Sequence, residues 1–232
     1  MTSPYFDLTG KVALVTGGSR GLGYQMAKAF ALHGADVIVA SRKLDNCEAV
    51  AAEIRAMGRR SLAHAAHCGR WDDIDHLIEA SYAAFGRVDI LVNNAGSGPR
   101  MASHEVTESL FDSVLNLNFK GPFRLASLVA KRMVDGDGGS IINISSSGSL
   151  VPLPHVVPYG SAKAALNAIR DTTTDFIPGR NWIRRLSGAE QHSKHVQSAI
   201  QSGRMRRAFL KGMGMQRNCA PPAAASWFRP HP

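Results

Sequence analysis

The sequence predicts an α/β domain in which a doubly wound parallel sheet lies between two layers of helices. Short, continuously apolar runs rich in β-branched residues alternate with segments of helical spacing. Strands without polar alternation are buried on both faces, which is typical of parallel strands joined by crossover helices. The expected strands are residues 11–16, 36–40, 61–66, 89–93 and 140–145.

Each expected strand is followed by an expected helix. Gly34, Gly58 and Gly86 each follow the last apolar residue of such a segment, where a helix C-cap favours a positive φ. Asp72 and Asp73 place negative charge in a first turn, where the helix dipole stabilises it. The expected helices are residues 21–33, 44–57, 72–85, 103–133 and 158–176.

The charge of the chain is unevenly distributed. Its 232 residues include 27 Lys and Arg and 18 Asp and Glu, a net charge of +9. Residues 1–170 hold 17 basic and 15 acidic side chains, whereas residues 171–232 hold 10 and 3. We therefore expect a nearly neutral core over residues 1–176 and a divergent basic segment over residues 177–232.

Three interpretations of the basic segment are open. Its periodicity is lost and its end is broken by prolines, which fits either a poorly ordered terminus or a shifted reading frame, and favours the latter. A basic tail that binds nucleic acid or acidic lipid is less favoured, because no sustained amphipathic stripe or aromatic platform is present. Without a sixth strand, the strand at residues 140–145 would be an exposed edge.

Cysteine content and hydropathy predict a cytoplasmic chain with no metal centre and no membrane partner. Cys47, Cys68 and Cys219 are too few and too scattered for a disulfide framework or a metal cluster. No run approaches the roughly 18 apolar residues of a membrane span, and no signal-peptide pattern opens the chain.

A glycine-rich turn joins the first expected strand to the first helix. Its spacing, G-x-x-x-G-x-G, lets the backbone approach a pyrophosphate and directs free helix N–H groups at it. The bare string also fits an ordinary tight turn, but its place in a βαβ unit favours phosphate binding. The residues expected to bind are Gly17, Ser19, Arg20, Gly21, Leu22 and Gly23.

The residues after the second strand indicate the cofactor. An acid there would bind the ribose 2′-hydroxyl of NAD, but this chain has Ser41, Arg42 and Lys43. Together with Arg20, these cations suit a 2′-phosphate. We expect NADP(H), with NAD(H) as the alternative. The other interpretation is that Arg42 and Lys43 are solvated loop residues that bind no ligand.

Tyr159 and Lys163 are four residues apart near a helix start, so they share one face. A nearby ammonium stabilises a phenolate and lowers its pKa, which makes the tyrosine a usable acid or base. A serine hydroxyl upstream would polarise a substrate carbonyl. Chemistry alone leaves Ser145, Ser146 and Ser147 equivalent.

These motifs, in this order and spacing, resemble the short-chain dehydrogenase/reductase family over roughly residues 8–170. The resemblance rests on the T-G-x-x-x-G-x-G loop, the Asn-Asn-Ala-Gly string ending at Gly96, and Tyr159-x-x-x-Lys163. It implies a Rossmann-type fold, here with an incomplete or divergent C-terminal edge. It further implies that the cofactor contacts Asn94, Ala95, Gly96, Tyr159 and Lys163.

The resemblance also implies a role for each polar residue. Ser146 stands 13 residues before Tyr159, as the family's polarising serine does. Asn118, with Asn116 as the rival, matches the asparagine whose backbone carbonyl holds a water beside Lys163. The family's aspartate after the third strand is missing, and the backbone of Cys68 and Gly69 is expected to hold the adenine instead.

The implied activity is hydride transfer between NADP(H) and a carbonyl or secondary alcohol, with Tyr159 exchanging the proton. The substrate classes are 3-oxoacyl, sugar or steroid-like compounds, bordered by residues 97–100 and 150–157. The family implies a homodimer or homotetramer through residues 118–133 and 158–176. An inactive cofactor-binding scaffold and a basic-tailed interaction protein are the alternatives.

Overall fold

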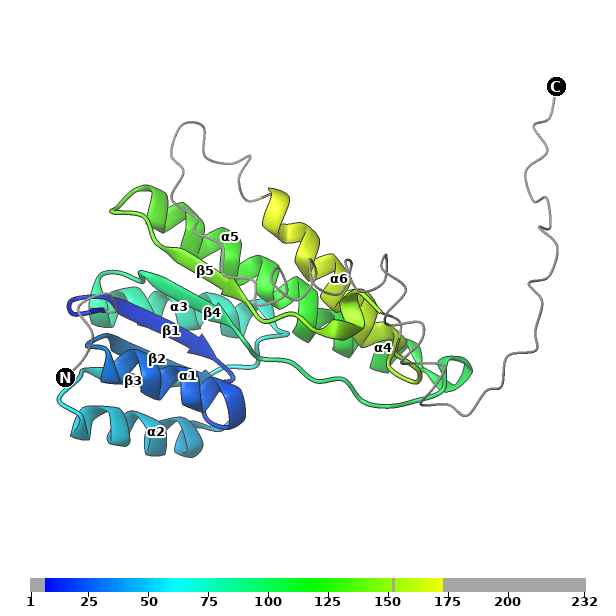
Figure 1. Cartoon of the computed structure of the whole chain (residues 1–232), viewed down its shortest axis with the longest axis horizontal. Coiled ribbons are helices and arrows are strands. Elements are labelled where there is room, and N and C mark those ends of the chain that lie inside the picture. The colour runs from blue at the N-terminus through cyan, green and yellow to red at the C-terminus, as the bar shows by residue number, and fades with distance from the viewer. Residues whose placement is uncertain (1–6, 152, 173–232) are drawn as a thin grey trace, which may run out of the picture. The chain divides into compact units, whose positions relative to one another are not determined.

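A computed structural model describes residues 7–151 and 153–172 of the chain. Five parallel strands form one sheet in the order β3-β2-β1-β4-β5 (Figure 1). The predicted class, a doubly wound parallel sheet, is confirmed. The strands are β1 (Val12–Thr16), β2 (Asp36–Ser41), β3 (Ser61–Ala65), β4 (Ile90–Asn93) and β5 (Ser140–Asn143).

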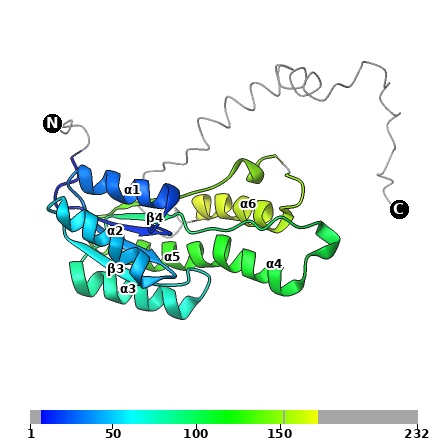
Figure 2. The same ribbon diagram turned by 90° about the horizontal axis from the view of Figure 1, so that it is seen from below.

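Helices cover both faces of this sheet. Figure 2 shows α1 on one side of it and α3 and α5 on the other. Because side chains alternate along a strand, Val12 and Leu14 pack in a buried cluster with α3 and α5, whereas Ala13 and Val15 pack with α1 and α2. The helices are α1 (Gly21–Leu32), α2 (Leu44–Ala56), α3 (Trp71–Phe85), α4 (Glu108–Leu115), α5 (Gly121–Val134) and α6 (Val157–Thr172).

The strand order reverses between β1 and β4. From β1 the chain proceeds outward through β2 to β3, then returns to place β4 on the other side of β1. In open α/β sheets a crevice forms at this switch point, beyond the carboxyl ends of the strands. The ends of β1 and β4, at Thr16 and Asn93, therefore mark where a ligand site is expected.

The segment expected as one helix over residues 103–133 is divided. A short 3₁₀ turn precedes α4, whose first turn is capped by Thr107, because its side chain accepts a hydrogen bond from the Leu110 N–H. A π-helical turn, Asn116–Lys120, then leads into α5. Pro122, at the start of α5, has no N–H to continue an α-helical ladder back to residue 118.

The other predicted boundaries lie within two residues of the observed ones, except the predicted helix end at residue 176, which lies outside the described residues; Gly34, Gly58 and Gly86 all have a positive φ. None of the helices formed by the described residues is long and apolar enough to cross a membrane. The predictions for residues 177–232, including the domain limit and the loss of a sixth strand, lie outside the described residues.

Candidate active site

Hydrogen bonds through Thr16 tie together the loops that follow β1 and β4. The Thr16 hydroxyl donates to the Val92 carbonyl (3.0 Å) and accepts from the N–H groups of Asn94 (3.0 Å) and Ala95 (3.1 Å). The Asn94 side-chain amide donates back to the Thr16 carbonyl (2.9 Å). This pairing fixes both sides of the crevice at the switch point.

At Gly17 and Gly23 the glycine-rich turn packs too closely to admit a side chain. A Cβ on Gly23 would stand 2.3 Å from the Gly17 carbonyl oxygen, and Gly17 itself has a φ of +64°. Arg20, the N-cap of α1, makes no side-chain capping hydrogen bond. The first N–H groups of α1 therefore keep their capacity to bind an anion, as the sequence predicts.

A cavity of about 370 Å³ opens beside this turn; we call it the nucleotide pocket. It brings together most of the residues predicted to bind the cofactor. Ser19, Leu22, Gly23 and Gly69 are not among its lining residues, and neither are Tyr159 and Lys163, which line a second cavity. The residues that line it are Gly17, Arg20, Gly21, Ser41, Arg42, Ala66, Cys68, Asn94, Ala95, Gly96, Ser97 and Leu117.

The nucleotide pocket is basic and its cysteine is buried. Arg20 and Arg42 both line it, and no acidic side chain does so among the described residues. Burial raises the pKa of the Cys68 thiol to about 12, so the thiol stays protonated at neutral pH. The Gly69 N–H is engaged elsewhere, because it donates to Nδ1 of His67 (3.2 Å).

Ala66 and Leu117 also line this pocket but are not predicted from the sequence. Ala66 directly follows β3. Because the carboxyl ends of parallel strands meet at one edge of the sheet, its position near the pocket could have been predicted from the parallel sheet. Leu117 lies in the π-helical turn. Nothing in the sequence predicts the π-helical turn, so the position of the Leu117 side chain at the pocket could not be predicted.

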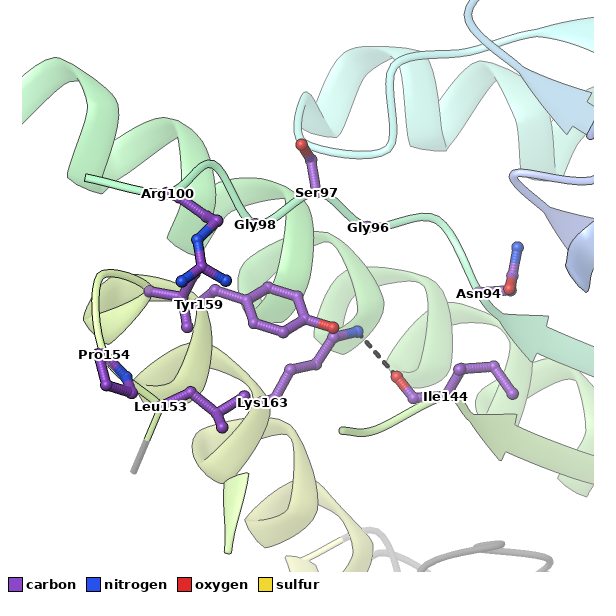
Figure 3. A pocket seen from close by; sticks show the side chains of 11 residues that line it. Asn94, Gly96, Ser97, Gly98, Arg100, Ile144, Leu153, Pro154, Tyr159 and Lys163 are labelled. Carbon is purple, nitrogen blue, oxygen red and sulfur yellow. Dashed lines mark hydrogen bonds between the residues drawn. The ribbon is translucent and has the colours of Figure 1, made fainter. Parts of the chain in front are cut away.

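A second cavity, of about 650 Å³, contains Tyr159 and Lys163; we call it the Tyr159 pocket (Figure 3). Tyr159 projects from α6. Both segments expected to border the substrate contribute to the wall. The described residues that line it are Asn94, Gly96, Ser97, Gly98, Arg100, Ile144, Leu153, Pro154, Val156, Tyr159 and Lys163.

Lys163 is the buried cation of the Tyr159 pocket. It is only 2% exposed, and its Nζ donates to the Ile144 carbonyl (2.8 Å) and lies 5.8 Å from the centre of the Tyr159 ring. Burial lowers the pKa of Lys163 to about 8. The amine can thus gain or lose a proton near neutral pH, beside the phenol predicted to work with it.

Asn118 lies behind the loop that follows β4. Its side chain is fully buried, and its amide nitrogen donates to the carbonyls of Ser97 and Val114, both at 2.9 Å. The helical partner of its own carbonyl would be the N–H of residue 122, which is Pro122 and has none. Asn118 thus fixes one wall of the pocket from outside it.

Ser146 is not among the described residues that line the Tyr159 pocket. It caps a 3₁₀ turn, where its hydroxyl accepts from the Gly148 N–H (3.1 Å). The neighbouring Ser145 hydroxyl lies 3.3 Å from that of Ser149. The structure brings Tyr159 and Lys163 into one pocket with Asn118 bonded to the loop at its wall, whereas Ser146 does not line that pocket.

Three known proteins illustrate what the chain is similar to. The human "dehydrogenase/reductase SDR family member 4" is 34% identical over 175 residues, which cover 75% of this chain and 63% of that protein. The Escherichia coli K12 "2-dehydro-3-deoxy-D-gluconate 5-dehydrogenase" is 35% identical over 214 residues, covering 86% and 84%. A crystal structure of a metagenomic short-chain oxidoreductase in complex with NADP is 34% identical, with a TM-score of 0.69 and coverages of 72% and 76%.

The chain therefore spans less than two thirds of the human relative's length. The sequence profile described as "short chain dehydrogenase" matches residues 11–183, most of the chain. With the confirmed fold and these relatives, that match shows that the chain belongs to the short-chain dehydrogenase/reductase family.

Proposed function

We propose that the chain is an oxidoreductase that prefers NADP(H) and interconverts a carbonyl and a secondary alcohol. One observation carries this proposal. The Tyr159 pocket and the nucleotide pocket share Asn94, Gly96 and Ser97, so a substrate beside Tyr159 would adjoin a bound dinucleotide. That arrangement suits direct transfer between cofactor and substrate.

The nucleotide pocket fits NADP(H) on three grounds. The uncapped start of α1 suits the pyrophosphate, and Gly17 and Gly21 line the pocket without side chains that would fill it. Arg20 and Arg42 suit the 2′-phosphate, and the similar metagenomic oxidoreductase was crystallised with NADP. When bound, NADP(H) would supply or accept the hydride.

The proposed proton chemistry belongs to the chain's own residues. The Tyr159 hydroxyl donates its proton to the carbonyl oxygen and, in the opposite direction, accepts it from the alcohol. Protonated Lys163 stabilises the phenolate that Tyr159 then becomes. The Asn118 carbonyl holds a water that connects Lys163 to solvent, and Ser146 polarises the substrate oxygen once its hydroxyl turns from Gly148.

We further propose that residues 1–176 form the catalytic core, that the protein is cytoplasmic, and that it is a homodimer or homotetramer through α5 and α6. Candidate substrates remain 3-oxoacyl, sugar and steroid-like compounds. The similarity to the Escherichia coli 2-dehydro-3-deoxy-D-gluconate 5-dehydrogenase supports a sugar derivative.

Substituting Tyr159 tests the assignment. We expect Tyr159→Phe to lower kcat for NADPH-dependent carbonyl reduction by at least about 100-fold, because general acid catalysis contributes on that order. Its NADPH Kd should change little. Steady-state rates over a carbonyl panel and fluorescence titration of NADPH provide the two measurements. Equal activity of the variant, or loss of NADPH binding with it, would contradict the proposed role.

A further inference from the structure

The loop after β4 holds a cation at the wall of the Tyr159 pocket. Its start is fixed because the Ser97 carbonyl accepts from Asn118 (2.9 Å). Its middle lies against the Tyr159 ring, since a Cβ on Gly98 would be 2.8 Å from ring carbon Cγ. At its end, the Met101 N–H donates to the His155 carbonyl (2.7 Å). The backbone that carries Arg100 is thus anchored on both sides.

Arg100 projects from this loop toward the pocket that Tyr159 enters from α6 (Figure 3). Within the described part of the chain, none of the ion pairs or side-chain hydrogen bonds involves Arg100, and no acidic side chain lines the pocket. The other cation there, Lys163, already donates to Ile144. Among the described residues that line this pocket, the Arg100 guanidinium is therefore the cation that remains available to a ligand.

Resting on the function proposed above, we propose that the substrate carries a carboxylate and that Arg100 binds it. A guanidinium offers two parallel N–H groups that match the two oxygens of a carboxylate. Arg100 does not line the nucleotide pocket, where Arg20 and Arg42 stand, so its charge serves the substrate rather than the cofactor.

A carboxylate fits this wall better than a phosphate. Phosphate sites combine several donors, commonly a glycine-rich turn or a helix N-terminus with a cation. The glycine-rich turn and the uncapped helix lie at the nucleotide pocket. Arg100 supplies one planar fork, which suits a singly charged, planar group. The substrate class is accordingly an oxo acid or the corresponding hydroxy acid.

The experiment compares short oxo acids with their methyl esters, using the full chain and NADPH. We expect wild type to favour each accepted acid over its ester, and Arg100→Gln to lower kcat/KM for the acids roughly 100-fold while barely changing the esters, because it removes the charged partner only. Arg100→Lys should recover part of the lost kcat/KM, since it restores the positive charge without the two parallel N–H groups of the guanidinium. Arg55→Gln, which removes an exposed α2 arginine, is the matched control and should change neither.

Equal effects of Arg100→Gln on acids and esters, or an unchanged preference, would overturn the proposal. If wild type reduces none of these compounds, the carbonyl panel described above decides the proposed activity, and calorimetry decides the binding assignment separately. The probe is then 4-oxopentanoate added to protein saturated with NADP⁺. Binding that Arg100→Gln abolishes supports the carboxylate site; absent binding, or stronger binding of inorganic phosphate at Arg100, refutes it.

Discussion

At the residue scale, the chemistry of this site depends on the burial of Lys163. The amine is 2% exposed and its pKa is lowered from 10.5 to about 8. Between these two values the unfolded chain holds a proton at this position that the folded chain has released. Stability therefore rises with pH across this window, because the unfolded state binds more protons.

We expect Lys163→Met to remove that contribution. The free energy of unfolding of wild type minus that of the variant should increase between pH 8 and 10.5, by at most about 1.4 kcal/mol per pH unit for one proton. Urea denaturation of both proteins over this range measures it. Taking the difference matters because Cys68, whose pKa is raised, acts in the opposite direction. A flat difference would show that the amine is not buried.

Residue type and spacing predicted the site only in part. Tyr159 and Lys163 share a pocket because a four-residue spacing fixes one helix face whatever the surroundings. Ser146 has no such constraint, since a hydroxyl in a turn can rotate toward a nearby backbone N–H, as it does toward Gly148. The engaged N–H of Gly69 likewise depends on a His67 contact that spacing does not specify.

At the scale of elements, the start of α5 lies directly against the loop that follows β3. A Cβ on Gly121 would stand 1.7 Å from the Cys68 carbonyl oxygen. The backbone of Gly121 has a φ of −65°, which any residue adopts. Only space, and not conformation, therefore excludes a larger residue at this position.

We expect Gly121→Ala to destabilise the fold by about 2 to 3 kcal/mol through overpacking, although alanine is the better helix former. Gly136→Ala is the matched control, because the nearest atom to its Cβ would be 3.7 Å away. Thermal and urea unfolding give the comparison. If Gly121→Ala is as stable as wild type, the contact between α5 and Cys68 is not tight.

Periodicity predicted the elements well where each is a single run, as for β1 and α3. It did not divide residues 103–133, because an apolar pattern with helical spacing runs through α4 and α5 alike. Pro122 was the available signal, but a proline in a first helical turn is ordinary and does not by itself indicate a π-helical turn.

At the scale of the whole molecule, cofactor preference should appear as stability. A ligand that binds only the folded state stabilises it according to its concentration relative to its Kd. At equal concentrations we expect NADP⁺ to raise Tm more than NAD⁺, and Arg42→Asp to reverse that order, since an acid there favours the ribose hydroxyl. Differential scanning fluorimetry measures these shifts in Tm. Comparing adenosine 2′,5′-bisphosphate with 5′-AMP isolates the contribution of the 2′-phosphate to the shift. An equal Tm with both dinucleotides would refute the preference.

The fold class follows from alternating buried strands and helices, so the sequence was sufficient to predict a doubly wound parallel sheet. The strand order itself comes from the structure. The charge split after residue 170 points to a boundary, but charge carries no information about packing. The predicted limit between residues 176 and 177 stays a prediction.

Asn94, Gly96 and Ser97 form a wall common to both pockets, so a ligand proposed for one pocket would contact residues that also line the other. When one occupant stiffens that wall, it alters the free energy with which the second binds, and thermodynamic reciprocity makes the effect equal in both directions. Under the proposed function, the affinities for cofactor and substrate would be linked quantities, and we expect a substitution at Ser97 to shift both.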